Sequence, residues 1–279
     1  MNIVKFLLDQ YKIIPNRESG QNFIQNEKIA NRFIESAQIQ PKDVVLEIGP
    51  GLGILTQKLC EKADTVIAVE KDLSLYKLLQ ESLKNYNNLI LLNENVLKLK
   101  LAHLSSVLFR AQKSVLFRAP KFKIVSNIPY SITSDFLYWL LENRKYISSS
   151  TLILQKEVVE RLIAGTETKL YGSLSVFFQT YTDLKILFSI PGSAFYPHTK
   201  VTSTVLYISP RRIKIKNEEL FFKIVKLSFA QRRKQLKNSL SSILSGVGTR
   251  HGVSIDLSRR PETLSYKEFI KLASGVQKL

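Results

Sequence analysis

The stretch Val44-Val45-Leu46-Glu47-Ile48-Gly49-Pro50-Gly51-Leu52-Gly53 decides the fold of this chain. Residues 44–48 are apolar apart from Glu47 and predict a buried strand, and a helical pattern begins at Leu52. Glycines at alternate positions between the two let the backbone turn tightly and approach a ligand, because no Cβ stands in the way. The segment therefore predicts a strand, a ligand-binding loop and a helix.

Outward from this segment, short β-rich runs alternate with helical patterns, as in a mainly parallel sheet with helices on both faces. The predicted strands are Val44–Ile48, Thr65–Val69, Leu89–Leu92, Phe122–Val125, Thr151–Leu154, Leu184–Ile190 and Thr204–Ile208. Helices are predicted over Leu52–Cys60, Leu73–Leu83 and Ile132–Leu141. The last two strands, which lie close together in the sequence, suit an antiparallel pair added to the sheet. The fold class is α/β, with a Rossmann-like domain.

An acidic residue, Glu70, ends the second predicted strand, 17 residues after Gly53. A carboxylate at this place accepts hydrogen bonds from both ribose hydroxyls of a bound nucleoside. The glycine loop and Glu70 together predict a nucleoside-type ligand. By themselves they leave NAD and S-adenosylmethionine equally open.

The tetrapeptide Asn127-Ile128-Pro129-Tyr130 follows the strand 122–125 and so lies at the carboxyl edge of the sheet, where such sheets bind ligands. The amino nitrogen of adenine is a poor nucleophile, because its lone pair is delocalised into the ring. The Asn127 side-chain carbonyl and the Pro129 backbone carbonyl are predicted to accept its two N–H bonds, while Tyr130 stacks on the extruded base. Alone, such a tetrapeptide is a common turn. Beside the glycine loop and Glu70, it predicts methylation of adenine N6 from S-adenosylmethionine.

The charge of the chain is strongly positive, with 41 Lys and Arg against 23 Asp and Glu. Residues 210–279 hold 16 of these cations and 5 of the acids, which leaves +11 on 70 residues. We therefore predict a methyltransferase domain over 1–209 and a small, basic, all-α RNA-binding domain over 210–279. Its proposed phosphate contacts are Arg232, Arg233, Lys234 and Lys237, on a predicted helix that buries Leu236, Leu240 and Ile243.

Several classes of protein are disfavoured by composition. Cys60 is the only cysteine and the three histidines are scattered, so neither a disulfide framework nor a metal site is expected. No apolar run is long enough to span a membrane, and no signal-peptide cleavage site follows the start, which favours a cytoplasmic protein. A tandem duplication, SVLFRAQK at 106–113 and SVLFRAPK at 114–121, is expected in a surface loop.

With these motifs in order, the chain resembles the ribosomal RNA adenine N6,N6-dimethyltransferases, specifically the small-subunit dimethyladenosine transferases of KsgA type. The resemblance runs from Gly20 nearly to the C-terminus. It rests on 20–23 (GQNF), 47–51 (EIGPG), 127–130 (NIPY), 154–158 (LQKEV), 171–176 (YGSLSV), 195–197 (FYP) with Lys200-Val201, 231–234 (QRRK) and 260–265 (RPETLS).

The resemblance implies roles for individual residues and a substrate. Cofactor contacts are implied for Asn22, Ile24, Gly49, Gly51, Glu70, Asn95 and Asn127. Phe195 is implied to face Tyr130 across the flipped adenine. The implied reaction dimethylates two adjacent adenosines in a hairpin near the 3′ end of small-subunit rRNA, within a pre-ribosomal 30S particle, by a monomer.

One departure from the family pattern affects the cofactor pocket. Asn95 stands where the family usually has an Asp that accepts from the adenine amino group of the cofactor. Two other functions stay open at this point. One is methylation of large-subunit rRNA, as in macrolide-resistance enzymes, and the other is a non-catalytic RNA-binding or transcription factor with the same fold.

Overall fold

The computed structural model describes residues 3–15, 20–111, 121–244 and 255–277. They form two compact units. One comprises residues within 1–156 and 185–210, and the other comprises residues within 157–184 and 211–279. The duplicated segment lies largely outside the described residues.

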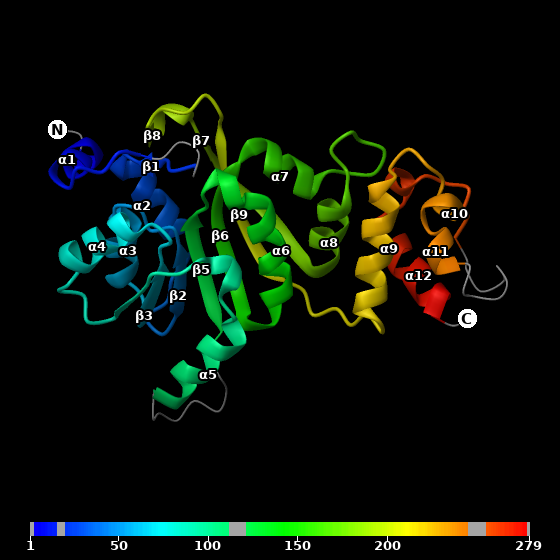
Figure 1. Cartoon of the computed structure of the whole chain (residues 1–279), viewed down its shortest axis with the longest axis horizontal. Coiled ribbons are helices and arrows are strands. Elements are labelled where there is room, and N and C mark those ends of the chain that lie inside the picture. Colours follow the sequence, from blue (N-terminus) through cyan, green and yellow to red (C-terminus); the bar gives the residue numbers. More distant parts are fainter. Residues whose placement is uncertain (1–2, 16–19, 112–120, 245–254, 278–279) are drawn as a thin grey trace. The chain divides into compact units, whose positions relative to one another are not determined.

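The first unit is built on a seven-stranded sheet with the order β4-β3-β2-β5-β6-β9-β7 (Figure 1). Strands β2 to β6 are parallel, and β9 runs antiparallel to β6. The strands are β2 (Val44–Ile48), β3 (Thr65–Val69), β4 (Leu89–Leu92), β5 (Phe122–Asn127), β6 (Ile147–Gln155), β7 (Thr182–Ile190) and β9 (Ser203–Pro210). All seven predicted strands are confirmed, with β6 longer than expected.

The order of the strands determines where a ligand can bind. From β2 the chain passes outward to β3 and β4, and then crosses back to β5 on the other side of β2. The direction of winding therefore reverses between β2 and β5, and a crevice opens there at the carboxyl ends of the strands. The loops 49–53 and 128–130 both leave the sheet at this crevice.

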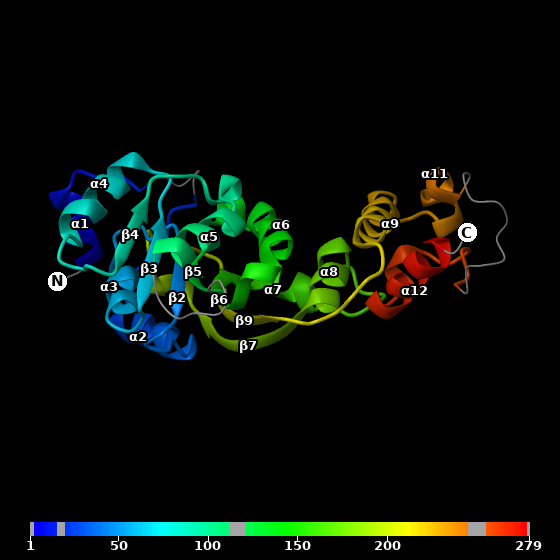
Figure 2. The same cartoon turned by 90° about the horizontal axis from the view of Figure 1, so that it is seen from below.

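Helices cover both faces of the sheet. Helices α2 (Glu27–Ser36) and α3 (Ile54–Cys60) lie on one side, and α5 (Leu101–Ala111) and α6 (Thr133–Asn143) lie on the other (Figure 2). Alternate strand residues face α2 and α3 in one core, namely Val45, Val66, Val125, Ile153 and Val205. Helix α4 (Leu73–Ser82) is capped by Asp72, whose carboxylate accepts from the amides of Ser74 and Leu75. Helix α1 (Ile3–Gln10) packs Val4 and Leu8 against the same apolar cluster as α4.

A two-stranded sheet that the sequence did not predict joins β1 (Phe23–Ile24) to β8 (Phe195–Tyr196). Two residues are too few to show strand periodicity, so only tertiary pairing reveals these strands. The pairing attaches the segment around Asn22 to the main unit.

The second unit is helical, with α7 (Lys156–Ile163) from Glu157 on, α8 (Ser173–Tyr181), α9 (Glu218–Ala230), α10 (Leu236–Ser239), α11 (Ser241–Leu244) and α12 (Tyr266–Gln277). Aromatic rings join α8 to α9, since Phe222 stacks on Phe177 at 4.4 Å and on Tyr181 at 5.8 Å between ring centroids. The first unit ends at Pro210, and the predicted boundary follows residue 209. Residues 157–184 pack with the C-terminal helices, however, rather than with the sheet where the prediction placed them.

The predicted helix through Gln231–Lys237 is interrupted. Helix α9 ends at Ala230, Gln231 leaves the helical region with φ −125° and ψ 51°, and α10 begins only at Leu236. The Gln231-Arg232-Arg233-Lys234 motif is therefore a turn between two helices. The core positions Leu236 and Leu240 are fully buried, as predicted. Within the described ranges, no helix combines the length and apolar character needed to cross a bilayer.

Candidate active site

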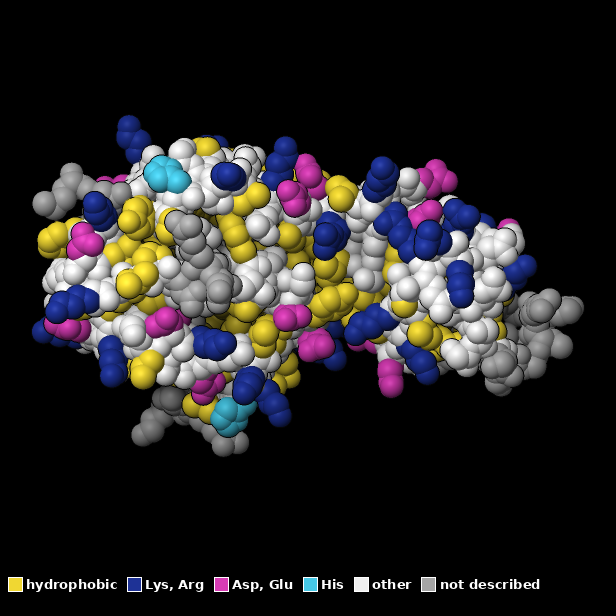
Figure 3. Space-filling view, turned by 45° about the horizontal axis from the view of Figure 1, so that its top comes forward, with side chains coloured by type: hydrophobic (Ala, Val, Ile, Leu, Met, Phe, Trp, Pro, Cys, Tyr) yellow, Lys and Arg dark blue, Asp and Glu magenta, His cyan; other side chains and the backbone are white. Residues whose placement is uncertain are grey.

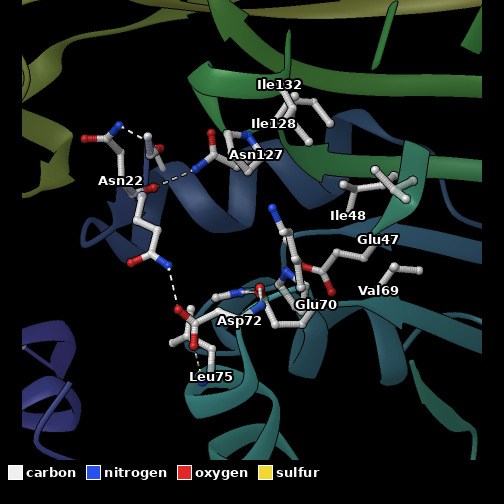
Figure 4. Close-up of a pocket in the computed structure, with 18 of the residues that line it drawn as sticks. Asn22, Glu47, Ile48, Val69, Glu70, Asp72, Leu75, Asn127, Ile128 and Ile132 are labelled. Atoms are coloured by element: carbon white, nitrogen blue, oxygen red, sulfur yellow. Dashed lines mark hydrogen bonds between the residues drawn. The ribbon is translucent and has the colours of Figure 1, made fainter. Parts of the chain in front are cut away.

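A pocket opens at the crevice between β2 and β5 (Figure 4). It lies within the first unit and is lined by segments 20–24, 47–52 and 54–55, 69–72 with Leu75, 94–96 and 127–132. The structure brings together most of the predicted site residues here: Asn22, Ile24, Gly49, Gly51, Glu70, Asn95, Asn127, Pro129 and Tyr130. These residues come from five separate places in the chain, so the fold alone assembles them.

The glycine loop needs its glycines for two reasons. Gly49 and Gly51 have φ of +62° and +60°, a conformation that other residues rarely adopt. A Cβ on Gly51 would also lie 2.8 Å from the Phe23 ring, and one on Gly49 would lie 3.1 Å from Pro129 Cγ. The loop therefore packs directly against β1 and against the 127–130 segment. Because these glycines have no side chain, the backbone of the loop lines the pocket directly.

The Glu70 carboxylate is fixed against the glycine loop. Its Oε1 accepts from the Asp72 amide at 2.9 Å, and its Oε2 accepts from the Gly51 amide at 3.3 Å. Burial raises the pKa of Glu70, and these two amides counteract part of that rise. A carboxylate has about four acceptor positions, so two hydrogen bonds leave capacity for a vicinal diol.

The orientation of the Asn127 side chain is set by a neighbouring carbonyl. Asn127 Nδ2 donates to the backbone carbonyl of Asn22 at 2.8 Å (Figure 4). Because an amide has a donor end and an acceptor end, this bond turns Oδ1 away from Asn22. Asn127 thus keeps an oriented acceptor at the pocket, which is the arrangement that an amino group of adenine requires.

The Pro129 carbonyl, predicted to accept from the target amino group, already accepts two hydrogen bonds within the protein. It accepts from the Ile132 amide and from the Thr133 hydroxyl, both at 3.2 Å. Both bonds hold the turn that starts α6 and occupy the two lone pairs of this carbonyl, which favours another backbone acceptor for the target amino group. Tyr130 lines the pocket and is half-buried, as a stacking residue should be.

Phe195 is also not where it was expected, because it does not line this pocket. Its side chain is fully buried in the core that contains Ile24 and Phe33. Successive strand residues point to opposite sides, so β8 turns Phe195 inward and leaves Tyr196 half-buried. In this conformation the structure does not place an aromatic ring from Phe195 opposite Tyr130.

Glu47 is a pocket residue that the sequence reasoning missed. It is 1% exposed and lines the pocket from β2. Burial raises its pKa to about 8, repulsion from Glu70 adds to the rise, and the nearby Thr56 hydroxyl offsets only part of it. Neither Glu47 Oε2 nor Thr56 Oγ1 has a well-formed hydrogen bond within the described chain. An acidic residue inside an otherwise apolar strand was the signal, and a cationic ligand would supply the missing partner.

Asn95 uses its acceptor oxygen within the protein. Asn95 Oδ1 accepts from the Leu97 amide at 3.0 Å and caps the short helix Val96–Lys98. This bond takes one of the two lone pairs of Oδ1, and the NH₂ end cannot accept from an amino group, so Asn95 has less acceptor capacity for the pocket than a carboxylate. An Asp would cap the helix with one oxygen and keep the other as an acceptor.

Asn95→Asp should therefore tighten binding of S-adenosylmethionine by roughly 1 kcal/mol, or about fivefold in Kd. Isothermal titration calorimetry would measure this change. Asn85→Asp, at an exposed position outside the pocket, makes the same change of charge and should leave Kd unaltered. Weaker binding by Asn95→Asp would show that this loop does not face the cofactor's adenine.

The basic turn, residues 231–237, contains one cation that is bonded within its unit and three cations that are exposed. Arg232 donates to Glu262 Oε2 at 2.8 Å and to the carbonyls of Lys169 and Thr168 at 2.6 and 2.7 Å, so it holds its own unit together. Arg233, Lys234 and Lys237 are exposed. Lys and Arg side chains gather on the surface over the C-terminal helices (Figure 3). No group of potential metal ligands occurs among the described residues.

Comparison with known proteins agrees with this geometry. The family model described as ribosomal RNA adenine dimethylase matches residues 15–278. The ribosomal RNA small subunit methyltransferase A of Alkaliphilus oremlandii is 36% identical over 98% of this chain and 96% of its own length. The protein of the same name from Clostridium botulinum (strain Kyoto / Type A2) is 38% identical over 98% of both chains.

Two solved structures share the fold. A dimethyladenosine transferase from Plasmodium falciparum superposes with a TM-score of 0.69 at 23% identity, covering 90% of this chain and 95% of that one. The 23S rRNA methyltransferase ErmE gives a TM-score of 0.64 at 22% identity, covering 91% and 99%. From the family model and the relatives together, the chain belongs to the ribosomal RNA adenine dimethylase family.

Proposed function

We propose that this protein dimethylates the N6 atoms of two adjacent adenosines in a hairpin near the 3′ end of small-subunit rRNA. The substrate is a pre-ribosomal 30S particle, and the enzyme acts as a monomer. The observation that best supports methyl transfer to adenine N6 is the Asn127 amide, which lines the pocket and is oriented by its bond to the Asn22 carbonyl. The names of the full-length relatives support the choice of subunit.

The pocket residues fit S-adenosylmethionine. Glu70 would hold the ribose hydroxyls, the loop of Gly49 and Gly51 would admit the methionine part, and Asn22 and Ile24 would close over it. The Oε2 atom of Glu47, which has no hydrogen-bond partner within the described residues, fits a ligand that carries positive charge. When bound, the cofactor supplies an electrophilic methyl group on a sulfonium centre.

The protein's own residues then act on the target base by positioning it. Asn127 Oδ1 accepts one N–H of the adenine amino group, and we assign the second to the backbone carbonyl of Ile128, which lines the same pocket. Two acceptors favour a pyramidal nitrogen whose lone pair faces the methyl group. Tyr130 stacks on the base and holds it in the pocket. No group with a special pKa is required at N6, because orientation and electrostatics carry the step.

The second unit would hold the RNA through the exposed cations of the basic turn. Replacing Arg233, Lys234 and Lys237 together by Gln should reduce the slope of log K against log salt by about two, since each lost phosphate contact removes roughly 0.7–0.9. Titration of small subunits at several salt concentrations would measure it. Gln at Lys28, Lys42 and Lys62, which are exposed in the first unit, is the charge-matched control. An equal loss of slope in both variants would contradict a specific RNA contact at the turn.

Methyl transfer to isolated subunits tests the proposed function against its rivals. Purified protein with labelled S-adenosylmethionine should label unmethylated small subunits and yield N6,N6-dimethyladenosine by nucleoside mass spectrometry. Label on large-subunit rRNA instead would favour the macrolide-resistance type of activity. RNA binding without any transfer would favour a non-catalytic factor.

A further inference from the structure

Ser203 contacts Tyr130, one of the residues that line the pocket, but is not itself a lining residue. It is the first residue of β9 and pairs with Gln155 of β6 across the antiparallel ladder. Its side chain is completely buried, and its hydroxyl lies 3.0 Å from the hydroxyl of Tyr130. A sheet residue therefore contacts the outer end of the ring that is proposed to stack on the target base.

Tyr130 is already held at its backbone end. The turn that begins at Pro129 is closed by the bond from the Ile132 amide to the Pro129 carbonyl. Gly20 packs so closely there that a Cβ on it would lie 2.8 Å from the Tyr130 amide nitrogen. These contacts fix the backbone of Tyr130 but leave its ring free to turn about the side-chain torsions.

The hydroxyl contact removes that remaining freedom. Because β9 is hydrogen-bonded into the sheet, Ser203 Oγ is a fixed point, and a ring anchored at both ends has one orientation. The ring stays half-buried, so part of it remains available to a ligand. Phe195 is buried in the core, so the structure offers no packing from that side chain to hold the ring.

We propose that Ser203 is a positioning residue, whose hydrogen bond to Tyr130 holds the aromatic ring in the orientation that receives the target adenine. This inference rests on the proposed function. It goes beyond the proposed function because the residue that orients the stacking ring, Ser203, lies outside the Asn127–Tyr130 motif.

Single-turnover methyl transfer to unmethylated small subunits tests the inference with four variants of the full-length protein. Ser203→Ala and Tyr130→Phe each remove the same hydrogen bond, and each should slow transfer by roughly tenfold. The double variant should be no slower than the slower single variant, because both changes remove one shared interaction. Ser150→Ala is the matched control. This serine is also buried in the sheet, and its hydroxyl has no hydrogen-bond partner in the described part of the chain, so its rate should stay within about twofold of wild type.

Two further readouts separate positioning from a merely structural role. The Kd of S-adenosylmethionine should be unchanged in Ser203→Ala, since the cofactor does not touch this bond. A hairpin carrying 2-aminopurine at the target position should be quenched less by Ser203→Ala than by wild type, because the base stacks less well. Ser203→Thr, which keeps a hydroxyl, should recover part of the rate.

Wild-type rates and wild-type quenching in Ser203→Ala, with an active wild type, would overturn this inference alone. Additive losses in the double variant would do the same. An inactive wild-type protein would overturn the proposed function and this inference with it.

Discussion

Asn127→Ala should slow methyl transfer by roughly a hundred- to a thousandfold, the usual effect of removing one preorganised group that stabilises a transition state. The structure gives the reason. The bond from Asn127 Nδ2 to the Asn22 carbonyl turns Oδ1 of this pocket residue away from Asn22, and alanine removes that acceptor entirely. RNA affinity should stay within about twofold, because the proposed phosphate contacts in the second unit would supply most of it. Single-turnover kinetics and subunit titration measure the two quantities separately.

A matched variant is needed because Asn127 also ties two segments together. Asn88 makes the same kind of bond away from the pocket, since its Nδ2 donates to the carbonyls of Cys60 and Ala63. Asn88→Ala should lower the melting temperature without lowering the transfer rate of the folded protein. If Asn127→Ala lost rate, RNA affinity and stability together, Asn127 would be a structural residue and the proposed chemistry would be contradicted.

Affinity for S-adenosylmethionine should rise with pH, by about twentyfold between pH 6.0 and 7.5. The pKa of Glu47 is raised to about 8 in the free protein, so its carboxyl is largely protonated over this range. A cationic ligand favours the carboxylate and therefore binds with release of a proton. The affinity then rises about tenfold per pH unit well below the pKa and levels off above it.

Calorimetry in buffers of different ionisation enthalpy would measure both the affinity and the released proton. Glu47→Gln should bind more weakly than wild type at pH 7.5 and should lose the pH dependence. A flat profile in the wild type would show that Glu47 stays protonated when the cofactor binds. If the affinity still rose with pH in Glu47→Gln, the titrating group would be Glu70 instead, because burial also raises the pKa of Glu70.

The sequence was sufficient for the parts of the molecule that follow local rules. Each of the seven strands of the sheet carries enough apolar residues to be recognised, and parallel connectivity places the ends of β2 and β5 together. The sequence alone therefore predicts that Gly49, Glu70 and Asn127 line one pocket. The basic character of the C-terminal segment follows from composition alone.

What sequence could not predict depends on how hydrogen bonds are distributed in three dimensions. Pro129 and Asn95 both looked like acceptors, but Thr133 and Leu97 already use their oxygens. Arg232 looked like an RNA ligand, but it bonds to Glu262. Phe195 has the right chemistry for stacking, yet the direction of a two-residue strand puts it in the core.

The same limit explains the residues that were missed. Glu47 was noticed only as part of a strand, because its missing partner is visible only when burial is known. Ser203 contacts Tyr130 from 73 residues away in the chain. The place of residues 157–184 in the second unit has a similar cause, since the stacking of α8 on α9 is a tertiary contact between distant segments.

Mapping the modified nucleotides tests the central claim most directly. Unmethylated small subunits would be treated with the protein and S-adenosylmethionine, and nuclease fragments of their rRNA would be sequenced by mass spectrometry. We predict two adjacent N6,N6-dimethyladenosines in one hairpin near the 3′ end, and none with Asn127→Ala. Methylation at any other position, or none at all with the wild-type protein, would contradict the account.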